Sequence, residues 1–356
     1  MKTENLQCVK VKKIRGEQVR CALNELELLR TDAKITSTSD FIYLPLTRSL
    51  KEEEKAVIGV AELLTTDFVI SEQRRSLEAL VGFKPSYEII GDIAVLTEDT
   101  DSINETNEQL VAHALIKQYK NINVVAKRVS PVEGVFRKTR MKIIAGDNRT
   151  ETMHTENGCR YKLDLEKVYF NPRLAAERNR VVMQVECSGK EEIIDMFAGV
   201  GPFSIQIAKR ASQSHVTAID INPDAISYLR ENIDLNGVKN VEAIEGDIRD
   251  IHVKFQDTAD RIIMNLPKSA YLFLREALSM LNRRGGLIHF YDVESSYVSA
   301  EKTKSLEVAI NRAKEKLTAE LKDACEHFHS LEILKARKVK PYAPYAYIIG
   351  IDAMIK

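Results

Sequence analysis

A glycine turn after a short apolar stretch is the segment of this sequence best suited to bind a nucleotide-like ligand. The segment DMFAGVGPFS, residues 195–204, carries Gly199 and Gly201 directly after the apolar stretch 193–196. Glycine lets the backbone approach a ligand closely, and the start of a following helix offers free N–H groups. A dinucleotide-binding loop would have a third glycine where Ser204 stands, so the pattern argues against a nicotinamide cofactor.

Three carboxylates follow three successive expected strands, and together they describe one ligand. Asp195 ends the first strand, where a carboxylate would face a pyrophosphate badly but suits a cationic group. Asp220, followed by Ile221, ends the second strand and can accept both hydroxyls of a ribose. Asp247, followed by Ile248, comes after the third strand and can accept the exocyclic amine of adenine. A ribose, an adenine and a positive centre describe S-adenosylmethionine, whereas the bland alternative is three capping or surface acids.

The fourth expected strand ends in the tetrapeptide NLPK, residues 265–268. Ligands of doubly wound sheets lie beyond the carboxyl ends of the strands, so Asn265 and Pro267 can present an amide and a free carbonyl to a base. The alternative is an ordinary strand-to-helix turn with proline near the helix start. Amino-methylating enzymes of this fold typically carry Asn/Asp-Pro-Pro-Tyr, and Leu266 and Lys268 depart from it. Since no cysteine lies near this segment, cytosine C5 chemistry is also disfavoured.

The elements that must position these residues alternate between strand and helix over 166–356, the pattern of a mostly parallel α/β sheet. The expected parallel strands are 193–196, 216–220, 241–245, 261–265 and 287–291. Two further strands, 331–338 and 346–353, are predicted to form an antiparallel hairpin at the sheet edge. We therefore expect a Rossmann-like domain with a mostly parallel sheet and a C-terminal antiparallel hairpin.

Two smaller α/β or α+β domains are expected before this sheet. In the first, Val9 and Val11 alternate with lysines as in an edge strand, and apolar residues over 16–30 have helical spacing. In the second, strands are expected near 89–96 and 124–126, with a helix over 107–120. The expected divisions are 1–70 for the first domain, 71–86 for a polar linker, 87–165 for the second domain and 166–356 for the Rossmann-like domain.

The charge balance and the cysteines limit the kind of protein. The 356 residues carry 52 basic and 52 acidic side chains, so adhesion to any polyanion is not expected. Two local basic runs, 127–142 and 335–340, could nevertheless follow RNA phosphates, although solvated charge is the plain alternative. The five scattered cysteines form no CxxC pair, and the alternation of Cys325, His327 and His329 lacks the spacing of a metal site. We expect a cytoplasmic, metal-free monomer with no membrane segment.

Several of these segments resemble one family when they are taken together. DMFAGVGPFSI, AIDINP, GDIR and NLPK are similar to segments of the archaeal and eukaryotic tRNA (guanine-N1)-methyltransferases that act on guanosine 37. The upstream segments AGDNRT (145–150) and VYFNPRLAAER (168–178) also resemble that family, although Asn171 stands where some members carry serine. The similarity covers most of 130–356 closely and the first domain loosely. It implies methyl transfer from S-adenosylmethionine to N1 of guanosine 37 in the tRNA anticodon loop.

The resemblance implies a role for individual side chains. Glu177 is similar to the family's general base, which must remove the N1 proton of guanine, and Arg149 to the residue that stabilises negative charge on O6. Asn265 would orient the base and Tyr169 would pack beside it. The cofactor residues that the motifs and the resemblance imply are Arg178, Asp195, Gly199, Gly201, Asp220, Ile221, Asp247, Ile248, Asn265 and Pro267. The second domain would bind RNA and carry the catalytic arginine, and the first would contact the tRNA body at the outer corner of the L.

Two other functions stay open at this point. Relatives in the wyosine pathway methylate a tricyclic guanine at carbon or transfer the aminocarboxypropyl arm of the same cofactor, and a dual activity is also compatible with the motifs. A catalytically silent tRNA-binding module is the alternative from a different class. The intact acids Asp195, Asp220 and Glu177 argue against a silent module.

Overall fold

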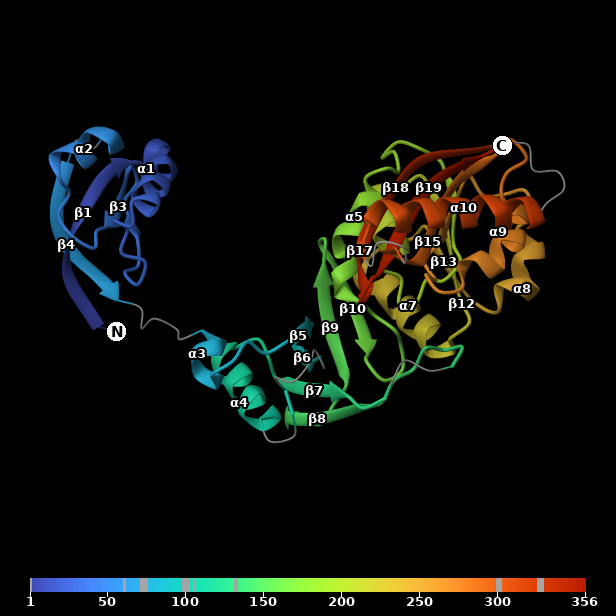
Figure 1. The fold of residues 1–356 in the computed structure, drawn as a ribbon, viewed down its shortest axis with the longest axis horizontal. Helices are drawn as coiled ribbons and strands as arrows, with labels where there is room; N and C mark the ends of the chain where they lie inside the picture. Colours follow the sequence, from blue (N-terminus) through green and yellow to red (C-terminus); the bar gives the residue numbers. More distant parts are fainter. Residues whose placement is uncertain are drawn as a thin grey trace. The chain divides into compact units, whose positions relative to one another are not determined.

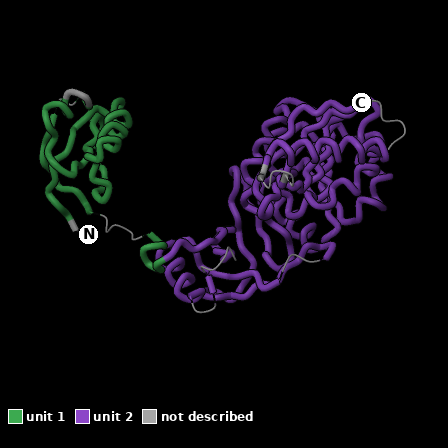
Figure 2. The backbone as a smooth tube through the Cα atoms, in the orientation of Figure 1, with its two compact units in different colours: residues 1–82 green, residues 83–356 purple. Residues whose placement is uncertain are grey.

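The structure, a computed structural model, describes residues 2–59, 62–70, 76–97, 103–104, 107–130, 134–298, 303–324 and 330–356. The chain divides into two compact units, residues 1–82 and residues 83–356, coloured separately in Figure 2. Cys325, His327 and His329, which the sequence analysis weighed as a metal site, lie outside the described residues. Among the described residues, no helix combines the length and apolar character that crossing a membrane requires.

The first unit is built on an antiparallel sheet of four strands in the order β2-β3-β1-β4 (Figure 1). The strands are β1 (Lys2–Lys12), β2 (Thr36–Ser37), β3 (Phe41–Pro45) and β4 (Glu62–Ile70). β1 pairs with β3 on one side and β4 on the other, so the prediction of an edge strand at Val9 and Val11 is wrong. Alternation of apolar residues with lysines indicates only that one face of the strand is buried. A central strand of a sheet that is covered on one side has the same alternation, so the pattern does not distinguish it from an edge strand.

Helix α1 (Lys13–Glu25) buries Val19 and Leu23 against this sheet. The helix begins three residues before the predicted range 16–30 and ends five residues before the end of that range. The prediction ran too far because Leu28 and Leu29, which lie within that range, are buried after the helix end. The other helices of the unit are α2 (Glu52–Ile58) and α3 (Leu77–Val81). The first unit therefore has an apolar cluster of its own.

The second unit begins with a sheet of four strands in the order β5-β6-β7-β8. The strands are β5 (Tyr87–Ile90), β6 (Ile93–Leu96), β7 (Val124–Arg128) and β8 (Met141–Gly146). Helix α4 (Glu108–Gln118) packs on β7 and β8, and these elements confirm the strands and helix predicted for this region. A hairpin of β9 (Glu151–Glu156) and β10 (Cys159–Asp164) follows and packs against α7 (Pro223–Asn236).

The site is positioned by a sheet of seven strands in the order β13-β12-β11-β14-β15-β19-β18 (Figure 1). The strands are β11 (Glu192–Asp195), β12 (His215–Asp220), β13 (Val241–Glu245), β14 (Arg261–Met264), β15 (Gly286–Ser295), β18 (Leu331–Ala343) and β19 (Ala346–Ile355). The first five run parallel, and β19 lies antiparallel between β15 and β18. This order confirms the expected Rossmann-like sheet with its C-terminal antiparallel hairpin.

Helices cover both faces of the large sheet. Apolar side chains of β14, β15 and β19 pack with α10 (Leu306–Ala324), whereas α6 (Ser204–Arg210) and α7 belong to the cluster that also contains Val216 and Ala218 of β12. The remaining elements are η1 (Pro172–Leu174), α5 (Ala175–Val182), α8 (Ile248–Ile251), η2 (His252–Phe255), η3 (Ala270–Phe273), α9 (Leu274–Met280), β16 (Tyr297–Val298) and β17 (Thr303–Lys304). Burial on both faces explains the apolar sequences of the central strands.

Candidate active site

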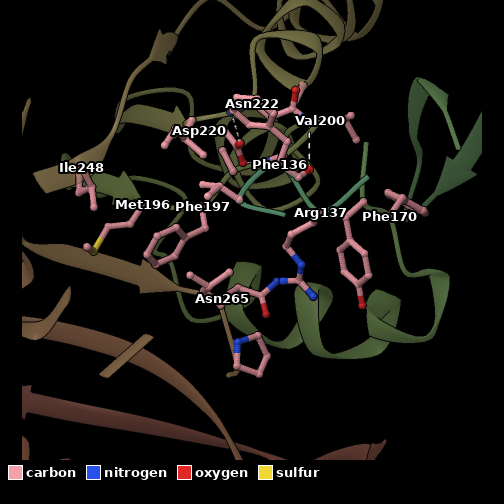
Figure 3. A pocket seen from close by; sticks show the side chains of 18 of the residues that line it. Phe136, Arg137, Phe170, Met196, Phe197, Val200, Asp220, Asn222, Ile248 and Asn265 are labelled. Carbon is pink, nitrogen blue, oxygen red and sulfur yellow. Dashed lines mark hydrogen bonds between the residues drawn. The ribbon is translucent and has the colours of Figure 1, made fainter. Parts of the chain in front are cut away.

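A pocket opens at the carboxyl ends of β11, β12, β13 and β14, where the strand order reverses from β11 to β14 (Figure 3). Such a reversal leaves a crevice above the sheet, because neighbouring connections leave in opposite directions. The lining residues from these strand ends are 196–200, 202, 220–222, 246–249 and 265–268. Of the residues proposed from sequence, those that line the pocket are Tyr169, Arg178, Gly199, Asp220, Ile221, Asp247, Ile248, Asn265 and Pro267.

The two glycines of the turn after β11 lie in different surroundings. Both have left-handed backbones, with φ of 56° at Gly199 and 87° at Gly201. Gly199 lines the pocket. Gly201 is turned toward the protein interior, where an added Cβ would lie 2.3 Å from Cδ1 of Leu229. Gly201 therefore shapes the turn from behind, and Gly199 provides its exposed backbone.

Asp220 connects the ends of β11 and β12. One carboxylate oxygen accepts the N–H of Gly199 at 2.7 Å, and the other accepts the N–H of Asn222 at 2.9 Å. Burial raises the pKa of Asp220 above its ordinary value, and these backbone hydrogen bonds oppose that shift. Each carboxylate oxygen has a further lone pair, so Asp220 can hold the turn and still accept ribose hydroxyls.

The end of β13 combines one polar group with an apolar surface. Asp247 caps α8 by accepting the N–H of Arg249 at 3.0 Å, and the hydrogen bonds from the Arg249 side chain keep the pKa of Asp247 below its ordinary value. The next residue, Ile248, is buried, and the rings of Phe197 and Phe273 meet edge to face at 5.2 Å. An apolar slot with a carboxylate at its rim suits the ring and exocyclic amine of adenine.

Asp195 lies beneath the turn rather than in the pocket lining. Its carboxyl group is fully buried and accepts a hydrogen bond from the Ser204 hydroxyl at 2.8 Å. Burial raises the pKa of Asp195 to about 7. The structure therefore gives Asp195 a direct contact with the turn, and its predicted contact with a cationic ligand stays a prediction.

Arg178 reaches the pocket from α5 in a fixed orientation. Its Nε donates to Glu156 at 2.6 Å, a second nitrogen also pairs with Glu156, and the same nitrogen donates to the carbonyl of Asn171 at 3.0 Å. Both charged side chains are almost completely buried, and the amide of Gln206 donates to Glu156 at 2.9 Å. Arg178 thus holds the segment before η1, which carries Tyr169 and Asn171, at the pocket wall.

The side of the pocket facing Asn265 is formed by Arg137 and Tyr169. The Arg137 guanidinium lies over the Tyr169 ring at 4.0 Å, and Figure 3 shows Arg137 extending into the pocket toward Asn265. Arg137 has φ of 53°, an uncommon backbone conformation for a residue with a side chain. Its loop is attached to the first turn of α7 by Lys138, which pairs with Asp224 at 2.7 Å. A strained backbone held in this way at a pocket wall is a hint of function.

Arg149 lies elsewhere and is not among the lining residues. Its guanidinium forms a two-armed pair with Asp92, with one arm at 3.1 Å, and also donates to the carbonyl of Glu151 at 2.7 Å. The hydrogen bond from Arg149 holds the pKa of Asp92 well below its ordinary value, as expected of a structural ion pair. The geometry thus does not bring the arginine chosen from sequence to the pocket, because that choice rested on a motif and not on a tertiary contact.

Glu177 is also outside the pocket lining, although it is next to Arg178 on α5. Its buried carboxylate accepts hydrogen bonds from Arg337, from Arg180 at 2.9 Å and from the Tyr291 hydroxyl at 2.7 Å. Burial would raise the pKa of Glu177, but the two arginines outweigh it and hold the pKa below its ordinary value. Glu177 is therefore ionised at neutral pH.

A second buried acid completes this network. Asp352 pairs with Arg180 at 2.7 Å and with Arg337 at 3.2 Å, and it accepts from His289 at 2.8 Å. Arg337 belongs to the basic run 335–340, which was considered as an RNA-binding surface. Because its side chain is 14% exposed and bound to two acids, Arg337 is a structural cation rather than a phosphate ligand.

The other basic run, 127–142, is likewise largely paired with acids. Lys127 and Lys142 pair with Glu108, Arg128 pairs with Glu88, and Lys138 pairs with Asp224. Arg137 is the member of this run that lines the pocket. The sequence analysis considered it only as part of a basic surface for RNA phosphates. Arg137 was visible in the sequence as one charge of a basic run. It could not be assigned to the site, because it is far along the chain from the strand ends that line the pocket. Within the described part of the chain, no group of three possible metal ligands is found.

The doubly wound sheet, its reversed order and the acids around one pocket define a Rossmann-like, S-adenosylmethionine-dependent methyltransferase. Comparison with protein-family models makes the class more specific. The TRM5/TYW2 methyltransferase domain matches residues 152–320, the tRNA methyltransferase 5 N-terminal domain matches 8–54, and the TYW2 N-terminal domain matches 71–150.

Individual relatives agree with this assignment. Trm5b of Pyrococcus abyssi, a tRNA (guanine(37)-N(1))-methyltransferase, is 40% identical over 97% of each chain. A solved structure described as the complex of aTrm5 and tRNALeu is 33% identical, with a TM-score of 0.66 over 98% of this chain and 99% of the other. A tRNA(Phe) (4-demethylwyosine(37)-C(7)) aminocarboxypropyltransferase of Methanocaldococcus jannaschii is 33% identical over 75% of this chain and 96% of its own. The chain belongs to the TRM5/TYW2 methyltransferase family.

Proposed function

We propose that this chain transfers the methyl group of S-adenosylmethionine to N1 of guanosine 37 in tRNA. The observation that carries the proposal is one pocket that joins a cofactor wall of strand ends to Arg137, which lies over the Tyr169 ring and extends toward Asn265. Similarity to a tRNA (guanine(37)-N(1))-methyltransferase over 97% of both chains supports the same reaction. The cofactor would contact Asp220, Asp247 and the Gly199 turn.

The proposed chemistry explains why a cation is needed near the base. Guanine N1 must lose its proton before its lone pair attacks the methyl carbon, and the bond from that carbon to the cofactor sulfur breaks as the N1–C bond forms. Negative charge then grows on O6, and a fixed guanidinium stabilises that state more than the ground state. We assign this role to Arg137 in place of Arg149, because Arg137 lines the pocket and Arg149 is committed to Asp92. The Asn265 amide would orient the base.

Glu177 remains the proposed acceptor of the N1 proton. Its lowered pKa supports this role in one respect, because an ionised carboxylate can accept a proton at neutral pH. In the described structure the carboxylate is occupied by Arg180, Arg337 and Tyr291. The proposal therefore requires that RNA binding frees at least one carboxylate oxygen and turns it toward the pocket.

A wyosine-pathway reaction is the second candidate, and the match of the TYW2 N-terminal domain to residues 71–150 is the observation that favours it. The experiment uses two preparations of cofactor, one labelled in the methyl group and one labelled in the carboxyl carbon of the methionine arm. Each is incubated with the protein and with tRNA that carries guanosine, adenosine or 4-demethylwyosine at position 37. Transfer of the methyl label alone, to N1 of guanosine 37, is expected. Transfer of the carboxyl label would establish the second candidate instead.

The domain division is part of the proposal. The first unit has its own apolar cluster and contributes no described residue to the pocket, which supports a role in holding the tRNA body. Deletion of residues 1–70 is expected to reduce kcat/KM on full-length tRNA, mainly through faster release, and to leave it unchanged on an anticodon stem-loop. An equal loss on both substrates would show that the unit supports the catalytic fold. A monomer in the cytoplasm completes the proposal, and the free thiols of the four cysteines that the structure describes suit a reducing compartment.

A further inference from the structure

The tip of the β18–β19 hairpin is an exposed but anchored part of the second unit. Tyr342 and Tyr345 on this tip are 44% and 53% exposed. The carbonyl of Tyr345 accepts hydrogen bonds from the backbone N–H and the hydroxyl of Ser296, at 2.7 and 3.0 Å. The tip therefore carries aromatic surface into solvent while its backbone is tied to the end of β15.

The two tyrosines of the tip have different surroundings. Tyr342 lines the pocket, and Nζ of Lys268 lies 5.1 Å from the centre of its ring. Tyr345 is not among the lining residues and instead meets Tyr297 edge to face at 5.7 Å. Only the first of these rings can therefore contact a molecule that enters the pocket.

Tyr342 and Lys268 repeat an arrangement found at another part of the same pocket. The Arg137 guanidinium lies over the Tyr169 ring, which is 38% exposed, just as Lys268 lies near the Tyr342 ring. The proposed function uses the first of these pairs and leaves the second without a task. Lys268 is exposed and follows Asn265 by three residues, so this pair borders the residue proposed to orient the base.

An exposed aromatic ring beside a cation is well suited to single-stranded RNA. The ring can stack on any nucleobase, and the cation can contact the phosphate of the same nucleotide. A base in an anticodon loop must leave its stack before its N1 can meet a methyl group, and an exposed ring at the pocket can compensate for the lost stacking.

We propose that Tyr342 and Lys268 form a stacking platform for a nucleobase of the anticodon loop at the pocket entrance. In this arrangement the Tyr342 ring stacks on the base and the Lys268 ammonium group contacts an adjacent phosphate. The platform rests on the proposed function, since it requires a tRNA anticodon loop as substrate. Tyr342 and Lys268 are thus positioning residues for RNA, separate from the groups that bind the cofactor.

The test compares Tyr342→Ala, Tyr342→Phe and the matched control Tyr345→Ala on an unmodified tRNA transcript with guanosine 37. Tyr342→Ala is expected to weaken RNA binding by about fivefold to a hundredfold, the range typical of one lost base–aromatic stack. Tyr342→Phe keeps the stacking surface and should bind like the wild type, as should Tyr345→Ala. Cofactor affinity, measured by calorimetry, should be unchanged in all three variants.

Lys268→Ala provides a second measurement that does not depend on the tyrosine. Loss of one phosphate contact should lower the slope of log Kd against log salt by about one for RNA binding, and Tyr342→Phe should leave that slope unchanged. A wild-type slope in Lys268→Ala would overturn its phosphate contact.

Three outcomes separate this inference from the proposed function. If wild-type protein methylates guanosine 37 and Tyr342→Ala binds and reacts normally, the platform is wrong and the function stands. If Tyr342→Ala instead loses cofactor affinity while RNA binding is unchanged, Tyr342 belongs to the cofactor wall and the inference is overturned. If wild-type protein fails to methylate guanosine 37, the function is wrong and the platform fails with it.

Discussion

The two sides of the pocket are assembled in different ways. The cofactor side consists of the segments that follow β11, β12, β13 and β14, each continuous with its own strand. The other side takes Arg137 from the loop before β8, Tyr169 from the segment before η1 and Tyr342 from the β18–β19 hairpin. The first side is thus given by the order of the strands, whereas the second draws its residues from three segments that are distant in the chain.

The site residues chosen from sequence divide between the pocket lining and the structure around it. Asp220, Asp247 and Asn265 were chosen because they follow strands, and all three line the pocket. Arg149 and Glu177 were chosen by resemblance of upstream segments, and both are held by ion pairs away from the lining. The source of a choice does not by itself decide its place, because Asp195 and Gly201 of the strand-end motif lie outside the lining, whereas Tyr169 and Arg178 of the upstream segments belong to it.

The largest expected effect concerns Glu177. Glu177→Gln should lower the single-turnover rate on tRNA by about 10²–10⁴-fold, because a general base is removed, while tRNA and cofactor affinities stay near wild type. Since Arg337 and Arg180 keep the pKa below its ordinary value despite burial, the wild-type rate should not fall with Glu177 protonation until the pH drops below the ordinary glutamate range. Glu186→Gln, at an exposed glutamate, is the control. Normal turnover by Glu177→Gln would remove Glu177 from the mechanism.

The second prediction compares the two arginines. Arg137→Ala should slow the chemical step by roughly 10²–10³-fold, as expected when a preorganised charge facing a developing oxyanion is lost. Arg137→Lys should recover only part of the rate, because an ammonium group lacks the planar fork. Rates are measured in single-turnover reactions with saturating cofactor.

Arg149→Ala is the counterpart in this comparison. It should react at nearly the wild-type rate. Its free energy of unfolding should fall by about 1 kcal/mol, because the ion pair with Asp92 is lost; the loss stays modest because the Arg149 side chain is about one-third exposed. A large rate loss in Arg149→Ala with a normal rate in Arg137→Ala would reverse the assignment.

The third prediction tests the cofactor side alone. Asp220→Ala should weaken S-adenosylmethionine binding by roughly 10–100-fold, because a charge-assisted hydrogen bond typically contributes ~1.5–3 kcal/mol. Asp234→Ala, at an exposed acid of α7, should bind like the wild type. Calorimetry on folded variants measures both, and unchanged affinity in Asp220→Ala would refute the ribose contact.

The last prediction concerns the pH dependence of stability due to Asp195. Its pKa is raised by burial from 3.8 in the unfolded chain to about 7, so its contribution to stability is complete below about 3.8 and is lost as the pH rises through about 7. Within that window the wild type should lose up to about 1.4 kcal/mol per pH unit relative to Asp195→Asn. Denaturant unfolding at about pH 5 and about pH 6 gives this difference. Parallel pH profiles for the two proteins would show that Asp195 does not titrate in this window.

The sequence by itself determined the sheet, the turn after β11 and the acids at the strand ends. Apolar periodicity and glycine spacing are local properties, and parallel strands bring their carboxyl ends to one edge whatever the rest of the chain does. For this reason Gly199, Asp220, Asp247 and Asn265 could be assigned to one site from their positions alone, and the family could be identified from their motifs.

Only the tertiary structure decided which charges are available for chemistry. Arg137, Arg149 and Arg337 all occur in basic or motif-bearing segments, but Arg149 is bound to Asp92 and Arg337 to Glu177 and Asp352. Arg137 instead reaches the pocket and lies over Tyr169. The partner of a charged side chain is set by segments far away in the chain, and that partner determines whether the charge stabilises the fold or faces a substrate.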